Sequence, residues 1–80
     1  MWEQGSYVYS DGQNNMTFTY EAKVYDNPSR HGINAGRVSK LVIFDPHGDY
    51  AVEFDRGWII KPKPKTIEKK VMEEILKKYI

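Results

Sequence analysis

The sequence contains no cysteine, no long apolar run and no large excess of charge of one sign. Without cysteine it forms neither disulfides nor a thiolate metal site, so a hydrophobic core alone must hold its 80 residues together. The longest unbroken apolar run, Leu41 to Phe44, is far shorter than a membrane span. We therefore expect one small folded domain over residues 1–80, with no membrane segment.

Signals for export and for common enzyme chemistry are also missing. Residues 1–10 lack a basic region followed by an apolar stretch, so the sequence predicts no signal peptide and a cytoplasmic location. It has no phosphate-binding loop, dinucleotide fingerprint, paired catalytic histidines or cysteine nucleophile. We accordingly expect no catalytic residues, no cofactor and a protein that is not an enzyme.

Charge is unevenly distributed along the chain, although the formal net charge is only +1. Residues 1–60 hold five basic and eight acidic side chains, a net charge of −3, whereas residues 61–80 hold seven and three, a net charge of +4. Any attraction to a charged partner must therefore be local.

Residues 65–79 have the period of an amphipathic helix. Apolar side chains recur three and four residues apart, and lysines and glutamates occupy the other side. Thr66 can accept hydrogen bonds from the first amides, while Glu73 with Lys77 and Glu74 with Lys78 are spaced as ion pairs. The apolar positions are Ile67, Val71, Met72, Ile75, Leu76 and Tyr79.

The preceding residues alternate with the period of two that is typical of strands. The predicted strands cover residues about 6–10, 16–26, 37–45 and 49–55, and residues 58–60 are a candidate fifth. In the second strand, the side expected to face the helix consists of Met16, Phe18, Tyr20, Ala22 and Val24. The third strand is apolar on both sides, which predicts a central strand covered on both faces. The fold class is therefore α+β, a four- to five-stranded antiparallel sheet packed on one C-terminal α-helix.

The connection over residues 26–36 is longer than a hairpin needs, and long loops often carry function. It holds Asp26, Ser29 and His31, the residue types of a catalytic triad, but triads are recognised by geometry across a fold. The interpretation that we favour is an ordered surface loop in which Gly32 and Gly36 adopt positive φ.

Anion binding is the alternative for this connection. Exposed backbone amides, together with Arg30 and Arg37, could hold a phosphate or a carboxylate. In the favoured interpretation, by contrast, Ile33 packs onto the edge of the core. Asp45, His47 and Asp49, in a second loop, predict a tight turn and no metal site.

Lysine alternates with proline from Lys61 to Lys65. Such a segment is extended and exposed, so Lys61, Lys63 and Lys65, with Lys69 and the exposed ring of Tyr25, could track single-stranded nucleic acid. A stiff linker that positions the helix is the simpler interpretation, and the one that we favour.

Several segments of the middle of the chain form a recognisable set: Glu21 to Asp26, Pro28, Ser29, Gly32, Ile33, Gly36 to Leu41 and Asp55 to Trp58. Through these residues the chain resembles, over about residues 18–62, a family of small uncharacterised proteins from Gram-positive bacteria and their phages. The resemblance implies a phage or mobile-element setting and assigns no activity.

The favoured function is that of a non-enzymatic module that binds a host or phage protein as a regulator or inhibitor. Interfaces are rich in arginine and aromatic residues. The predicted contact residues are Arg30, His31, Arg37, Arg56 and Trp58. Nucleic acid remains the alternative partner, and a homodimer through one edge of the sheet is left open.

Overall fold

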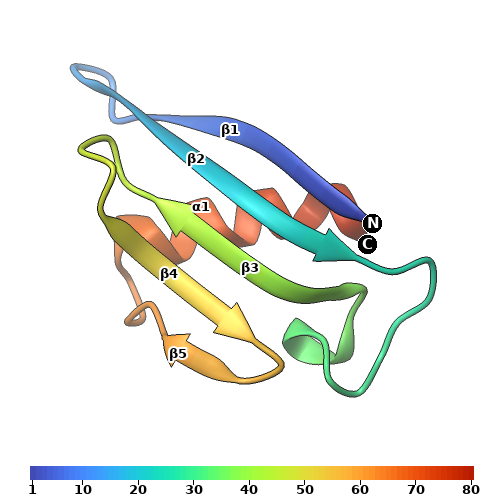
Figure 1. Ribbon diagram of the computed structural model, residues 1–80. Helices are drawn as coiled ribbons and strands as arrows, with labels where there is room; N and C mark the ends of the chain where they lie inside the picture. The colour runs from blue at the N-terminus through green and yellow to red at the C-terminus, as the bar shows by residue number, and fades with distance from the viewer.

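The computed structural model describes all residues from Met1 to Ile80. Each of five strands pairs antiparallel with its neighbours along the chain, so the sheet order is β1-β2-β3-β4-β5. The elements are β1 (Trp2–Ser10), β2 (Asn15–Val24), β3 (Val38–Phe44), β4 (Tyr50–Asp55), β5 (Trp58–Ile60) and α1 (Ile67–Leu76), with short 3-10 turns η1 (Ile33–Ala35) and η2 (Lys77–Tyr79). The predicted α+β fold with one C-terminal helix is confirmed (Figure 1).

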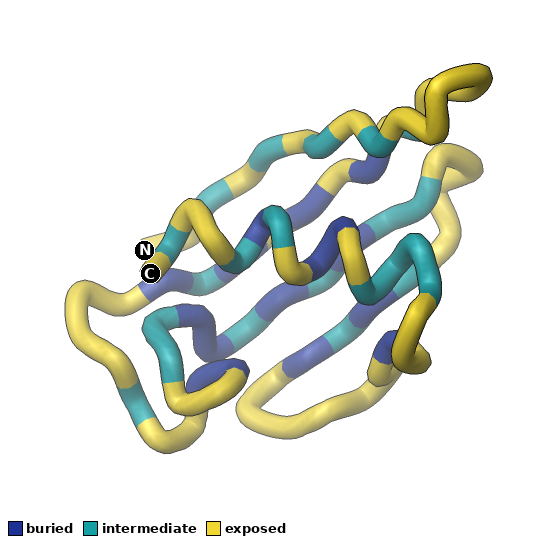
Figure 2. The backbone as a smooth tube through the Cα atoms, turned by 180° about the vertical axis from the view of Figure 1, so that it is seen from behind, coloured by how far each residue is buried: buried dark blue, intermediate teal, exposed yellow.

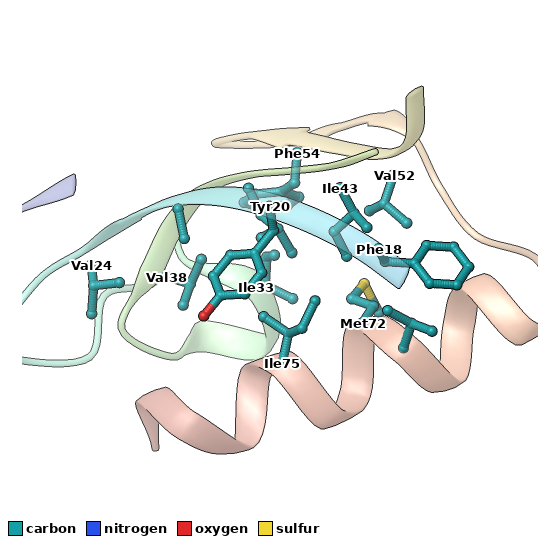
Figure 3. Packing of buried hydrophobic residues seen from close by; sticks show 13 residues of the cluster. Phe18, Tyr20, Val24, Ile33, Val38, Ile43, Val52, Phe54, Met72 and Ile75 are labelled. Carbon is teal, nitrogen blue, oxygen red and sulfur yellow. The ribbon is translucent and has the colours of Figure 1, made fainter. Parts of the chain in front are cut away.

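The core lies between one face of the sheet and α1. On β2 the predicted inward set is confirmed, because Phe18, Tyr20 and Ala22 are at most 4% exposed. From α1, Met72 and Ile75 reach the same cluster and are at most 2% exposed (Figure 3). The inward side of β2 and the apolar side of α1 therefore pack together in a single layer of apolar side chains.

The third strand, β3, is central, but only one of its faces is covered. Leu41 and Ile43 are buried under α1, whereas Val42 and Phe44, on the other face, stay partly exposed. All of α1 lies on one side of the sheet (Figures 1 and 2). The prediction that β3 is covered on both sides is therefore wrong, since one helix covers one face. We call the uncovered side the open face.

The first strand begins at Trp2, earlier than the predicted start at about residue 6. Its beginning is tied to β2, because the Met1 amino group donates to the Val24 carbonyl at 3.0 Å and the Val24 amide donates to the Met1 carbonyl at 2.8 Å. Gly5 interrupts the alternation of apolar and polar residues, so the sequence pattern does not reveal where this strand begins. The residue must nevertheless be small, because a Cβ there would lie 2.6 Å from the Tyr20 hydroxyl oxygen.

Two aspartates organise the turns at one end of the sheet. Asp11 Oδ1 accepts the amides of Gln13 and Asn14, at 2.9 and 2.7 Å, and these bonds lower the pKa of Asp11. Asp45 Oδ1 likewise accepts the amides of His47 and Asp49, both at 2.9 Å. The turn predicted around Asp45 is therefore confirmed, and the carboxylate is used to hold its backbone.

The connection between β2 and β3 is ordered, and Ile33 within it is buried, as predicted. The prediction that Gly32 and Gly36 supply positive φ is wrong: their φ values are −80° and −99°, and Asn34 and Ala35 adopt the left-handed conformation instead. Gly32 is needed for space, because a Cβ would lie 2.2 Å from the Gly36 carbonyl oxygen.

The helix is shorter than the predicted span of 65–79, because its last turn tightens into η2. Thr66 caps it as expected, its hydroxyl oxygen accepting the Lys69 amide at 3.2 Å. Lys77 pairs with Glu74, three residues earlier, in place of the predicted pairs at four residues. No helix is long and apolar enough to cross a bilayer.

Candidate partner-binding end of the sheet

All three arginines of the sequence lie at one end of the sheet. Arg30 belongs to the connection between β2 and β3, Arg37 immediately precedes β3, and Arg56 lies in the turn between β4 and β5. Because the strands are antiparallel, this connection and this turn meet at the same end (Figure 1). We call residues 25–37 together with residues 55–58 the arginine end.

Arg37 is engaged in holding the fold. Its Nε donates to the Tyr25 carbonyl at 2.8 Å, and its Nη1 donates to the Ile80 carbonyl oxygen at 3.4 Å. The Tyr25 amide in turn donates to the Arg37 carbonyl at 2.9 Å. One guanidinium thus closes the base of the connection and fastens the last residue to it. Arg37, which the sequence predicted as a contact residue, therefore has a structural role.

Arg30 and Arg56 are different, because both are exposed and neither side chain makes a hydrogen bond or ion pair within the chain. Arg56 lies in the left-handed region, with φ 56°. Its turn is held at two points: the Arg56 amide donates to the Ser39 carbonyl at 3.1 Å, and the Asp55 amide donates to the Gly57 carbonyl at 2.9 Å. A fixed turn therefore presents a free guanidinium to solvent.

His31 and Trp58 complete the predicted contact set. His31 is exposed, and its backbone amide donates to Ser29 Oγ at 3.1 Å, which uses that hydroxyl in a local turn. Trp58 packs edge-on against Phe54, with ring centroids 5.0 Å apart, yet 37% of its surface is exposed. The indole therefore both extends the core and contributes to the surface.

An apolar cleft of about 350 Å³ opens between this connection and the end of the helix. Its apolar walls come from Ile33 and Val38 on one side and from Leu76 and Tyr79 on the other, and the charged residues in its lining are Arg37, Lys77 and Glu73. This volume is at the lower end of the range for ligand pockets. Sequence reasoning missed the cleft; the only signal was that Leu76 and Tyr79 continue the apolar stripe of the helix beyond the residues that the sheet covers.

Two tyrosines at this end have shifted pKa values. Burial and the 2.8 Å hydrogen bond between its hydroxyl and that of Tyr20 raise the pKa of Tyr79. The neighbouring Lys23, whose Nζ lies 5.6 Å from the Tyr25 ring centroid, lowers the pKa of Tyr25. The Tyr79 phenol in the cleft therefore keeps its proton to a higher pH than an ordinary tyrosine does.

The residues predicted for nucleic-acid binding do not come together. Lys61, Lys63 and Lys65 are exposed at the opposite end, which we call the lysine end, whereas Tyr25 lies at the arginine end. Lys69 is half-buried in the first turn of α1. The sequence could not show this separation, because Tyr25 and the lysine segment are related only through the order of the strands.

Tyr50, which the sequence reasoning did not select, is the exposed aromatic at the lysine end. The residue is 57% exposed and shares a shallow depression with Lys61 and Lys63. Asp45 and Glu68 line the same depression and reduce its positive charge. The centre of the open face is acidic too, since Glu21 and Glu53 flank Val42 across β2, β3 and β4.

No curated protein and no solved structure matches the chain. A family model, described as "Domain of unknown function (DUF7678)", matches residues 1–80, which is more of the chain than the resemblance in the sequence covered. The chain, with its ordered arginine end and the adjoining cleft, therefore belongs to this family of unknown function.

Proposed function

We propose that the protein is a non-enzymatic binding module whose arginine end docks onto an acidic segment of a protein partner. The observation that carries the proposal is the pair of unpartnered guanidinium groups, Arg30 and Arg56, at the end of the sheet where the apolar cleft opens. Arginine forms bidentate hydrogen bonds with carboxylates, and such contacts beside an apolar pocket are typical of interface anchors.

The bound segment has a definite chemistry in this proposal. One apolar side chain enters the cleft between Ile33 and Leu76, and carboxylates elsewhere in the segment meet Arg30 and Arg56. Trp58 adds an exposed aromatic surface on the same end. Arg37 does not bind the partner directly; it holds the connection in the shape that forms the cleft.

The setting that we propose is that of a phage or mobile-element accessory protein, and the partner is a host protein that it regulates or inhibits. This part of the proposal rests on the resemblance of residues 18–62 to small proteins of Gram-positive bacteria and their phages. Docking through charge and one apolar anchor would be sufficient for such a role, because it requires no chemistry at the site.

The test is affinity capture from a host lysate with three forms of the protein. The double variant R30A/R56A removes the two free cations, and K61A/K63A removes the same charge at the lysine end as a matched control. We expect the wild-type protein and K61A/K63A to retain the same partner, and R30A/R56A to lose it. Equal capture by R30A/R56A with an intact circular dichroism spectrum would exclude the arginine end as the docking site.

Single-stranded nucleic acid is the second candidate partner, favoured by Lys61 and Lys63 beside the exposed ring of Tyr50. Binding of this kind weakens steeply as salt is added, because it releases counterions. A titration with single-stranded and duplex oligonucleotides at low salt tests it. If the wild-type protein binds neither single-stranded nor duplex oligonucleotides, or if K61A/K63A binds them as tightly as the wild-type protein, this candidate is eliminated.

A further inference from the structure

The two edges of the sheet differ in how they are protected against pairing with another strand. The β5 edge has three residues, pairs with β4 through a bulge and is followed by alternating lysine and proline. These are the devices by which proteins block sheet edges. The β1 edge has nine residues and contains no lysine, no proline and no bulge. It is therefore open to a further strand.

The backbone groups that face outward from β1 follow from its pairing with β2. Met1 and Val24 exchange both of their backbone hydrogen bonds, and the register continues without a shift to Ser10. Hydrogen-bonded and non-hydrogen-bonded pairs alternate in an antiparallel ladder, so every second residue of β1 points its amide and carbonyl away from β2. The outward residues are Trp2, Gln4, Ser6, Val8 and Ser10.

We propose that β1 pairs antiparallel with β1 of a second copy of this chain, with Ser6 facing Ser6 of the second copy. Ser6 is the midpoint of the outward residues, so this register, and no other, pairs all of them: Trp2 with Ser10 and Gln4 with Val8 of the other copy. The two sheets then form one continuous sheet in which no outward group of β1 is left without a partner.

The side chains of β1 suit a second copy as well as its backbone does. Its single charged side chain, Glu3, lies opposite Tyr9 of the second copy, so no like charges within the two strands meet. Tyr7 lies opposite Gly5, beside the Tyr20 ring that occupies the space over Gly5 within each copy. The sequence of β1 is thus complementary to itself in this antiparallel register, which favours a second copy of the chain over a foreign peptide.

The test is the mass in solution, by sedimentation velocity, of charge variants at the two-fold axis. The wild-type protein is expected at twice 9.4 kDa. In S6K two lysines face each other, and in S6E two glutamates do, so each variant alone is expected at the monomer mass. An equimolar mixture of S6K and S6E brings opposite charges together and is expected to restore the dimer.

The matched control is T19K, because Thr19 is the neighbour of Ser6 on β2 and shares its face, one strand away from the edge. T19K is expected to remain dimeric. If S6K does not fold, S6P replaces it, since proline there removes only an outward amide. The proposal is overturned by a monomeric wild-type protein, by a dimeric S6K or S6P, by a mixture that stays monomeric, or by a monomeric T19K. None of these masses depends on partner binding at the arginine end.

Discussion

The two ends of the sheet carry basic side chains in different surroundings. At the arginine end, Arg30 and Arg56 have no partner within the chain, and an apolar cleft opens at the same end of the sheet. At the lysine end, Lys61 and Lys63 share their depression with Asp45 and Glu68. The number of basic side chains would favour the lysine end as the docking site. The absence of ion-pair partners around Arg30 and Arg56 favours the arginine end. The difference shows that the local surroundings of a charge decide which surface is available to a partner.

The largest expected effect concerns the backbone that shapes the arginine end. G32A should destabilise the fold by about 3 kcal/mol, as overpacking does, because its Cβ would overlap the Gly36 carbonyl oxygen. G57A is the control in the same end of the sheet, since a Cβ there meets nothing within 4 Å. Urea denaturation measures both free energies of unfolding, and equal values would show that the connection does not have the described packing.

The next effect concerns Arg37. R37A removes the bonds to the Tyr25 and Ile80 carbonyls and should lower the free energy of unfolding by about 1 kcal/mol. K63A, at the lysine end, removes a side chain without a hydrogen bond or ion pair and should leave it unchanged. A chemical denaturation curve of R37A that coincides with that of K63A would contradict the structural role of Arg37.

Alkaline pH should weaken the arginine end through Tyr79. The pKa of Tyr79 is raised above its ordinary value of 10.0 in the folded protein, so the folded state holds the phenolic proton more tightly than the unfolded state. The stabilisation is complete below pH 10 and is lost as the pH rises further. The melting temperature should therefore fall less between pH 9 and pH 11 in Y79F than in the wild-type protein. A parallel fall in both would contradict the assignment.

The smallest expected effect uses two residues with positive φ, one at each end. Arg56 and Lys65 have φ values of 56° and 68°. R56G and K65G should each stabilise the fold by about 0.5–1 kcal/mol, because glycine adopts this conformation without a steric cost. Only R56G should weaken capture of the partner. A thermal melt combined with affinity capture separates the effect on stability from the effect on binding. Loss of capture by K65G would place the partner at the lysine end and contradict the proposal.

The elements of the fold were largely predictable because local patterns specify them. Alternation on β2 and the cap at Thr66 act over neighbouring residues, and both are found as predicted. The start of β1 was not predictable, because the need for a glycine at position 5 comes from the Tyr20 ring on the neighbouring strand and not from the local pattern.

The candidate site was predictable only in part. Arg30 and Arg56 were expected in one contact set, and the antiparallel strand order places both at the same end of the sheet; their binding role stays a prediction. The cleft required Ile33 and Leu76, far apart in the sequence, to come together. Likewise, Tyr25 and the lysine segment were grouped by residue type, and strand order separates them.

Hydrogen–deuterium exchange of the complex with the captured partner tests the central claim most directly. The account predicts slower exchange on binding at amides of residues 26–37 and 55–58, and unchanged exchange over residues 61–66 at the lysine end. Protection confined to residues 61–66, or spread equally over both ends, would contradict it.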